Sequence, residues 1–392
     1  MKKLVAFILC MALVITCVAC FAACNPTDGG SEVSYNKNWK VAMVTDYGDI
    51  TDQSFNQTTY EACKWYCEEF NIEFQYYKPT GDSTAERVAS VNQAIAAGYN
   101  VIVMPGYAFA GTVVEVASKN PTVKFIAMDV AQGDLFEAYY GKEYDYNPTN
   151  PKWTYELPSN VACFVYQEEV AGYFAGYAAV KEGFRKLGFL GGMAVPAVQR
   201  YGYGFVQGAN AAAVELNVAK DVEIKYAYGN QFYGDDTITA KMDTWYGAGT
   251  EVVFACGGGI YTSACEAAKK VGKFVIGVDV DQSAIINAYR SDMCVTSAMK
   301  GLAATTKTAL ANLMVGNWSL YAGKIEKLGL IGTDVEANYV QLPTATWTMK
   351  KFTVEEYKAL EAKIFNGEVV VSDSTAAMPT TTITVDNQGN IK

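Results

Sequence analysis

The sequence predicts an α/β protein of two lobes, each a doubly wound parallel sheet, with a ligand cleft between them. Three observations support this fold class. Apolar strands alternate with helices of about a dozen residues, one such unit recurs in the second half, and the chain has 392 residues, 51% of them apolar. That length and apolar content exceed one ordinary domain, so two lobes with separate cores are expected.

The first half opens with residues 40–45 (KVAMVT), which lack polar alternation and therefore predict a strand buried on both faces. Residues 57–70 and 84–97 predict helices, and residues 72–77 and 101–104 predict the next two strands. This order of strand and helix is typical of βαβ units in a parallel sheet.

The second half repeats the unit, because residues 97–104 (AGYNVIVM) resemble residues 248–255 (AGTEVVFA). Each copy continues with a glycine-containing turn, a small-residue helix and a strand that ends in aspartate. The predicted helices are 111–119 and 263–271, and the predicted closing strands are 124–129 and 273–279. The copies span 31 positions from Gly98 and 30 positions from Gly249 to their closing aspartates, so both halves share one architecture.

The closing aspartates, Asp129 and Asp279, predict where a ligand binds. In open α/β sheets the ligand crevice lies beyond the carboxyl ends of the strands, and large sites favour domain interfaces. We therefore expect the two carboxylates to face one another across a cleft between the lobes.

Composition excludes several function classes. The chain has no histidine, which rules out a Ser-His-Asp triad, a Cys-His dyad and a His-ligated metal. Carboxylate-only and Ser-Lys chemistry remain open, but we expect no enzyme, no catalytic residue, no metal and no cofactor. The net charge is −10, or −12 without Lys2 and Lys3, and basic stripes are absent, so no nucleic-acid partner is expected.

The N-terminus predicts export. Lys2 and Lys3 precede the apolar run 4–18, and residues 21–24 (FAAC) lie directly before a polar stretch. This pattern is typical of a lipoprotein signal peptide, 1–23, with Cys24 as the lipidated residue and 24–38 as a polar tether. The alternative is an uncleaved anchor helix over 4–23, which has the length of a bilayer span; either way the body lies outside the cytoplasm.

Six cysteines belong to the body of the protein. Most of them interrupt apolar runs, and a large domain does not need disulfide bonds, so buried free thiols are the favoured interpretation. Four residues apart on one helix, Cys63 and Cys67 are awkwardly placed for a disulfide bond, although it is not impossible. The six are Cys63, Cys67, Cys163, Cys256, Cys265 and Cys294.

The turn after the first strand is rich in polar groups. Asp46 is followed by residues 52–57 (DQSFNQ), which place polar side chains and Phe55 where a ligand would lie. Asp52 or Ser54 is equally suited to capping the following helix. In the second half, residues 257–259 (GGG) are expected to let the backbone approach a ligand.

These residues resemble a signature of the basic membrane protein family, the purine-nucleoside-receptor-like substrate-binding lipoproteins of ABC transporters. The resemblance extends from about residue 40 to residue 340. Further matches follow in chain order at Asp129, 167–176, 188–192, 200–208, 277–282 and 296–300.

The resemblance implies a type I periplasmic-binding-protein fold with three crossings between the lobes. It also implies a lipid-anchored solute-binding protein, monomeric, that captures a nucleoside by lobe closure and delivers it to a permease in the cell membrane. The boundaries that it implies are 39–164 plus about 300–338 for the N-terminal lobe, 165–299 plus about 339–375 for the C-terminal lobe, and 376–392 for a C-terminal tail.

The resemblance further implies the ligand contacts. Asp46, Phe55 and Asn56 would contact the base, and Asp129 the ribose hydroxyls. Asp279 and Lys300 would contact further polar groups of the nucleoside. An aromatic residue of the second lobe should close the other face of the base, and Phe232 is the first choice, ahead of its neighbour Tyr233.

Some positions depart from the family pattern. Asp49, Tyr201 and Tyr203 replace more usual residues, and residues 135–160 form a long aromatic-rich stretch that would either reshape the cleft or pack over one lobe. Three alternatives stay open: a sugar or signalling-ligand receptor of the same fold, a carboxylate-based nucleoside or glycoside hydrolase, and a surface adhesin that binds no small ligand.

Overall fold

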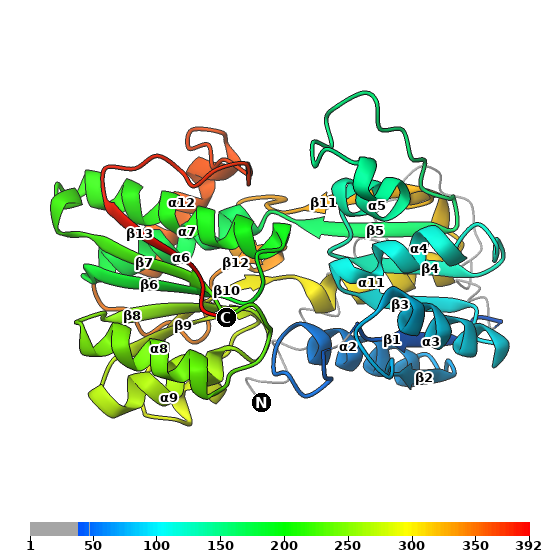
Figure 1. Ribbon diagram of the computed structural model, residues 1–392, viewed down its shortest axis with the longest axis horizontal. Helices are drawn as coiled ribbons and strands as arrows, with labels where there is room; N and C mark the ends of the chain where they lie inside the picture. Colours follow the sequence, from blue (N-terminus) through cyan, green and yellow to red (C-terminus); the bar gives the residue numbers. More distant parts are fainter. Residues whose placement is uncertain (1–37, 47) are drawn as a thin grey trace, which may run out of the picture. The chain divides into compact units, whose positions relative to one another are not determined.

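The computed structural model describes residues 38–46 and 48–392, so the predicted signal peptide, Cys24 and most of the tether lie outside it. The described residues form two sheets, each with helices on both faces (Figure 1). None of the helices in residues 38–46 and 48–392 is long and apolar enough to cross a membrane.

The N-terminal lobe contains a parallel sheet of six strands in the order β11-β5-β4-β3-β1-β2. Its strands are β1 (Val41–Val44), β2 (Phe74–Tyr77), β3 (Val101–Pro105), β4 (Lys124–Met128), β5 (Val161–Tyr166) and β11 (Lys324–Leu328). Its helices are α2 (Phe55–Glu69), α3 (Thr84–Ala96), α4 (Ala110–Val116), α5 (Gln132–Tyr140) and α11 (Leu302–Met314).

The C-terminal lobe contains seven strands in the order β12-β10-β9-β8-β6-β7-β13, of which only β12 runs antiparallel to its neighbour. Its strands are β6 (Lys186–Gly191), β7 (Glu223–Tyr228), β8 (Val252–Cys256), β9 (Phe274–Asp279), β10 (Cys294–Lys300), β12 (Val340–Gln341) and β13 (Thr384–Asn390). Its helices are α6 (Glu168–Glu182), α7 (Pro196–Glu215), α8 (Asp236–Gly247), α9 (Tyr261–Val271), α10 (Ser283–Asn287) and α12 (Val354–Phe365).

Strand β1 shows why the sheets are doubly wound. Val41 and Met43 pack with residues of α2 and α11, whereas Ala42 and Val44 pack with residues of α3 and α4. All four side chains are fully buried. Because successive side chains point to opposite faces, a strand that is apolar at every position needs helices on both sides, as its sequence predicts.

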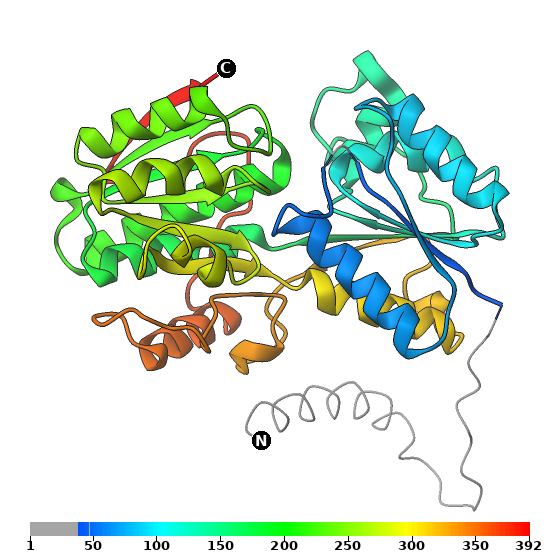
Figure 2. The ribbon, with the colours of Figure 1, turned by 90° about the horizontal axis from the view of Figure 1, so that it is seen from below.

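The chain passes between the lobes three times, and the crossing segments lie side by side (Figure 2). The backbone N–H of Gln167, after β5, donates to the oxygen of Leu328 at 2.8 Å, and that of Gly301, after β10, donates to Tyr339 at 2.8 Å. The Tyr339 N–H in turn donates to Gly329 at 3.0 Å. The three crossings are therefore joined by main-chain hydrogen bonds.

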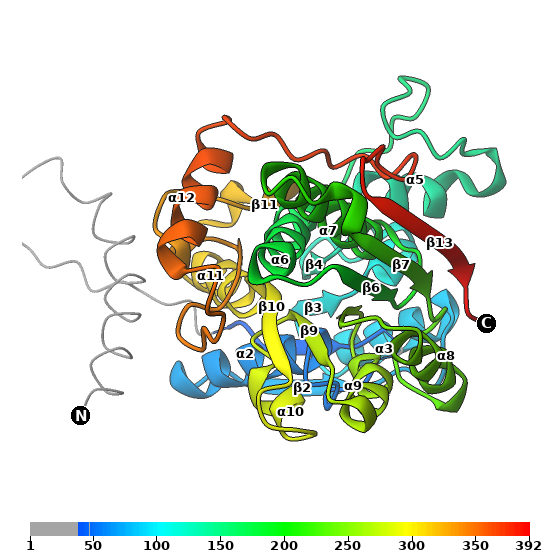
Figure 3. The same cartoon turned by 90° about the vertical axis from the view of Figure 1, so that its left-hand side faces the viewer.

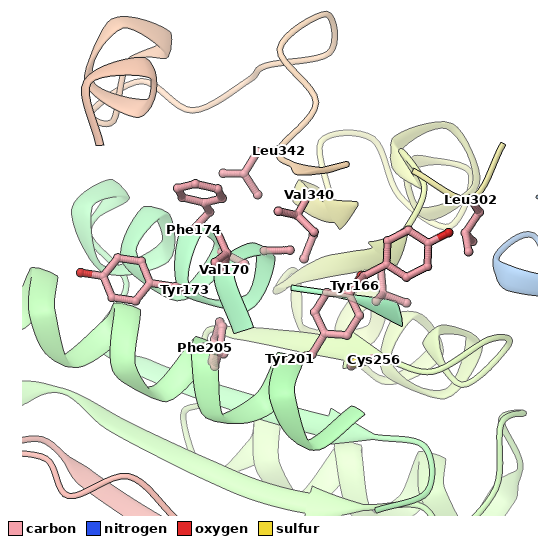
Figure 4. Packing of buried hydrophobic residues seen from close by; sticks show 14 of the residues in the cluster. Tyr166, Val170, Tyr173, Phe174, Tyr201, Phe205, Cys256, Leu302, Val340 and Leu342 are labelled. Carbon is pink, nitrogen blue, oxygen red and sulfur yellow. The ribbon is translucent and has the colours of Figure 1, made fainter. Parts of the chain in front are cut away.

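Helices α6 and α7 pack backbone to backbone. Gly172 and Gly176 of α6 and Gly204 and Gly208 of α7 alternate along the contact, and a Cβ at any of the four would collide with a backbone oxygen of the partner helix. Side chains of both helices, Phe205 among them, surround this contact (Figure 4). Gly204 and Gly208 thus serve helix packing, whereas Gly202 makes room for the Tyr226 and Phe189 side chains of the sheet.

The predicted C-terminal tail, 376–392, needs a correction. Residues 384–390 form β13, which pairs in parallel with β7 at the edge of the C-terminal sheet (Figure 3). The sequence TVDNQGN is polar and lacks the β-branched alternation that predicts a strand. Its pairing comes from the open backbone groups of β7, which no side-chain pattern in the tail reveals.

The aromatic stretch 135–160 begins as the end of α5, and the remainder packs on itself. Phe136, Tyr144 and Trp153 form a separate buried cluster, and the Trp153 ring nitrogen donates to Asp145 at 2.8 Å. The six body cysteines are buried free thiols, as expected.

Candidate functional site

A pocket of about 320 Å³ lies between the two lobes. This volume is at the lower end of the range for small-molecule sites. All seven residues that the resemblance implies as ligand contacts line this pocket. They are Asp46, Phe55, Asn56, Asp129, Phe232, Asp279 and Lys300.

The turn after β1 is held by Asp52. Its carboxylate accepts the backbone N–H groups of Ser54 at 2.9 Å, Asn56 at 2.9 Å and Gln57 at 3.0 Å. Burial raises the pKa of Asp52, and these hydrogen bonds oppose that shift. The capping interpretation is therefore right for Asp52, which fixes Phe55 and Asn56 at the start of α2.

Ser54 has a different role from the cap that its position predicts. Its hydroxyl donates to the Asp279 carboxylate of the other lobe at 2.5 Å and makes no side-chain cap. Nearby, the Gln282 amide donates to the backbone oxygen of Gln53 at 3.1 Å. These two contacts tie the amino end of α2 to the C-terminal lobe.

One end of the pocket is a buried charge cluster around Lys300, whose side chain is only 3% exposed. The Lys300 ammonium lies 2.6 Å from Asp129, 3.6 Å from Glu168 and 3.8 Å from Asp279. Burial lowers the pKa of Lys300, but the three carboxylates together raise it above its usual value. Lys300 is therefore a cation at physiological pH, and its charge opposes the rise in pKa that burial gives Asp129 and Asp279.

Asp129 and Asp279 do stand at the ends of their strands and meet across the pocket, both with left-handed backbones of φ 60° and 66°. Burial raises the pKa of Asp129 to about 6, and Lys300 limits the rise. The Oδ1 atom of Asp129 is buried with no hydrogen-bond partner among the described residues. That oxygen therefore has unused acceptor capacity in a residue that lines the pocket.

A second polar part of the pocket lining is formed by Asp46 and Asn56. The Asn56 amide nitrogen donates to Asp52 at 3.2 Å, which leaves its carbonyl oxygen buried and without a partner in the described part of the chain. Asp46 accepts from the N–H of Gly48 at 2.8 Å. Gly106, at φ +127°, makes room for Asp46, because a Cβ there would lie 2.5 Å from Oδ2. This part of the lining offers acceptors to N–H donors.

Aromatic side chains also line the pocket. The Lys300 ammonium is 4.6 Å from the centroid of the Phe55 ring, a cation–π distance. On the other lobe, Phe232 rests on glycine backbone, since a Cβ at Gly192 or Gly257 would lie 2.5 Å or 2.9 Å from its ring. Residues 257–259 do line the pocket, yet the contact that requires glycine is with Phe232.

Several residues of the site were missed by the sequence interpretation. Tyr107 and Tyr201 line the pocket, and Glu168, behind Lys300, accepts from the Arg200 guanidinium at 2.7 Å. Tyr201 stood out only as a departure from the family pattern. None of residues 135–160 lines the pocket. Leu135, Tyr155 and Leu157 of this segment pack with the core of the N-terminal lobe.

Comparison with known proteins finds a matching family model and similar proteins. A family model described as "ABC transporter substrate-binding protein PnrA-like" matches residues 39–375. The chain is 28% identical over 346 residues to basic membrane protein B of Borreliella burgdorferi, covering 86% of this chain and 89% of that protein. It is also 28% identical to the ABC transporter nucleoside-binding protein BmpA of Lactococcus lactis, covering 74% and 77%.

Among solved structures, a solute-binding protein of an ABC transporter system from Aeropyrum pernix superposes with a TM-score of 0.66 at 19% identity. The match covers 86% of this chain and 94% of the other. A similar protein from Conexibacter woesei gives 0.63 at 21% identity, covering 86% and 99%. The predicted α/β fold of the type I periplasmic-binding-protein class is confirmed by these likenesses and by the two parallel sheets.

Proposed function

The chain belongs to the family of PnrA-like substrate-binding proteins of ABC transporters, and we propose that it captures a purine nucleoside and delivers it to a membrane permease. One observation carries the proposal. The pocket lining combines two chemically different polar groups of residues with aromatic side chains, and a purine nucleoside is a flat aromatic base joined to a polyol.

The base fits the part of the lining that holds Asp46 and Asn56. A carboxylate accepts N–H groups from a purine edge, and the Asn56 carbonyl oxygen has no partner among the described residues. Phe55 and Phe232 come from opposite lobes, so both faces of a planar base would be covered. Stacking on such rings is worth about 1–3 kcal/mol per base.

The ribose fits the end that holds Asp129, Asp279 and Lys300. A sugar hydroxyl group both donates and accepts hydrogen bonds, so it matches a carboxylate and an ammonium group side by side. Hydrogen bonds to charged groups contribute about 1.5–3 kcal/mol each.

Charge favours a free nucleoside over a nucleotide. Five aspartates line the pocket against one cation, Lys300, among the described residues. A phosphate group would enter a field of its own sign, which opposes binding. The five are Asp46, Asp49, Asp52, Asp129 and Asp279.

Calorimetry and thermal unfolding with adenosine, guanosine and inosine test the proposal. We expect the melting temperature to rise by several degrees with the bound nucleoside, because a ligand that binds only the folded state stabilises it. Stabilisation by a pentose or hexose and by no nucleoside would favour the sugar receptor. Release of free base from the nucleoside would favour the hydrolase instead.

We also propose that the protein is a monomer held to the outer face of the cell membrane through lipid on Cys24. Substitution Cys24→Ser should release it from the membrane fraction in soluble or uncleaved form. Cys20→Ser is the matched control and should leave attachment unchanged. Membrane attachment that survives Cys24→Ser would support the anchor helix over residues 4–23.

A further inference from the structure

Tyr201 lies on α7 at the wall of the pocket, with 2% of its surface exposed. Its hydroxyl oxygen is buried and has no hydrogen-bond partner among the described residues. Burying a donor without a partner is unfavourable, because the group gives up its hydrogen bonds to water. This hydroxyl group therefore has unused bonding capacity at the pocket.

The surroundings of Tyr201 place it at the charged end of the pocket. The Lys300 ammonium is 5.8 Å from the centroid of its ring. Burial raises the pKa of the Tyr201 hydroxyl well above its usual value, and the charges of Asp279 and Glu168 raise it further. The hydroxyl group is thus a neutral donor at physiological pH.

Two acceptors of the same cluster are also unfilled. Asp129 Oδ1 and Glu168 Oε1 are buried without hydrogen-bond partners in the part of the chain that the structure describes. A donor and two acceptors around one cation match groups that both donate and accept, which is the property of a sugar hydroxyl.

The backbone of Tyr201 is held firmly. Its carbonyl oxygen packs directly against Gly172 of α6, where a Cβ would collide with it. Tyr166 and Tyr201 are both seen beside this helix pair (Figure 4), and the Lys300 ammonium lies 5.3 Å and 5.8 Å from their ring centroids. The Tyr166 hydroxyl is already used, since it donates to Thr305 at 2.8 Å. Of these two hydroxyl groups, that of Tyr201 is therefore the one available to bond a ligand.

We propose that Tyr201 is a specificity-determining residue, whose hydroxyl group donates a hydrogen bond to a sugar hydroxyl of the bound nucleoside, directly or through one ordered water. The inference rests on the proposed function and deepens it, because it assigns a residue that reads the sugar and not the base.

The test uses Tyr201→Phe in the full chain, purified in detergent. Calorimetry measures affinity for adenosine, guanosine and inosine, and for the 2′-, 3′- and 5′-deoxy forms of whichever binds most tightly. We expect Tyr201→Phe to lower the affinity for that nucleoside about 5- to 30-fold. For one of the deoxy forms, wild type and variant should bind equally, since the partner hydroxyl is absent.

Tyr203→Phe is the matched control. Tyr203 lies two residues further along α7, is 9% exposed and does not line the pocket, so its variant should keep affinity within about twofold. Thermal unfolding adds a readout independent of the ligand. Empty Tyr201→Phe should melt at or above the wild-type temperature, because the hydroxyl group has no protein partner to lose.

The outcomes separate the inference from the proposed function. Wild-type binding with no loss in Tyr201→Phe overturns the inference alone. An equal loss for the nucleoside and all three deoxy forms also overturns it, because the hydroxyl group then reads no sugar hydroxyl. Failure of the wild type to bind any of the three nucleosides overturns the proposed function and the inference together.

Discussion

The two copies of the repeated unit have the same backbone and different chemistry. In the N-terminal copy, Gly106 (φ +127°) follows β3 and Asp129 (φ 60°) follows β4. In the C-terminal copy, the corresponding residues are Gly257 (φ +149°) and Asp279 (φ 66°). Both glycines are needed because a neighbouring side chain occupies the space of a Cβ. That neighbour is Asp46 beside Gly106 and Phe232 beside Gly257.

The aspartates differ in the same way. Each is held by a residue of the opposite lobe, but Asp129 contacts the ammonium of Lys300 and Asp279 accepts from the hydroxyl of Ser54. The two copies of one architecture therefore line the same pocket with different side chains, Asp46 beside the first glycine and Phe232 beside the second. The shared backbone determines where these side chains lie, and the identity of the side chain that packs against each glycine determines which part of a ligand it can bind.

The largest expected effect comes from removing the ion pair of the N-terminal copy. Lys300→Met leaves Asp129 and Asp279 buried without a cation, whereas Glu168 keeps its pair with Arg200. Unfolding free energy should therefore fall by about 3–5 kcal/mol, or roughly 6–20 °C in melting temperature. Lys270→Met is the control. It breaks an exposed pair with Asp243 and should cost at most about 1 kcal/mol. Equal stability of both variants would contradict the importance of the Lys300 cluster.

The paired aspartates should act on affinity more than on stability. Asp129→Ala and Asp279→Ala should each weaken nucleoside binding ~10- to 150-fold by calorimetry, because a hydrogen bond to a charged group is lost. The melting temperature of the empty protein should change little. If instead the melting temperature falls and affinity stays within about twofold, both residues stabilise the turns after their strands and do not contact the ligand.

The two phenylalanines of the pocket, one from each lobe, should contribute somewhat less. Phe55→Ala and Phe232→Ala should each weaken binding roughly 5- to 150-fold, because one face of the base loses its stacking partner. Tyr233→Ala is a useful control, since this neighbour is 62% exposed at the edge of the pocket. A larger loss of affinity for Tyr233→Ala than for Phe232→Ala would show that the ring of Tyr233, and not that of Phe232, covers the base.

The smallest effect concerns pH. The pKa of Asp129 is raised to about 6, and a ligand hydroxyl group bonds best to the ionised form, so affinity should fall roughly tenfold between pH 7 and pH 5. The empty protein shows the opposite sign. Its folded state holds the proton more tightly than the unfolded state, so this group makes it lose stability as pH rises from about 4 to about 6.

Asp129→Asn is the control for the pH prediction, because an amide does not titrate in this range. Lys300, Glu168 and Asp279 still face the position. A wild-type affinity profile that matches the flat profile of this variant would mean that Asp129 stays ionised throughout.

The sequence predicted the sheets because their strands are apolar at every position, as in residues 40–45. It could not predict β13, whose polar residues pair through backbone groups alone. At the site, strand ends located Asp129 and Asp279. Ser54 escaped prediction, because the same side chain that suits a helix cap bonds across to the other lobe, and only the assembled fold brings the two together.

The glycine contact between α6 and α7 limits how this protein can acquire a new ligand. With backbones touching at four places, neither helix can shift to accommodate a larger or smaller side chain on that face. Glu168, the first residue of α6, and Tyr201, in the second turn of α7, are therefore fixed in position. Only the identity of these two side chains can change. We therefore expect ligand specificity to evolve through the loops at the ends of the strands, where Asp46 and Phe232 pack against glycine.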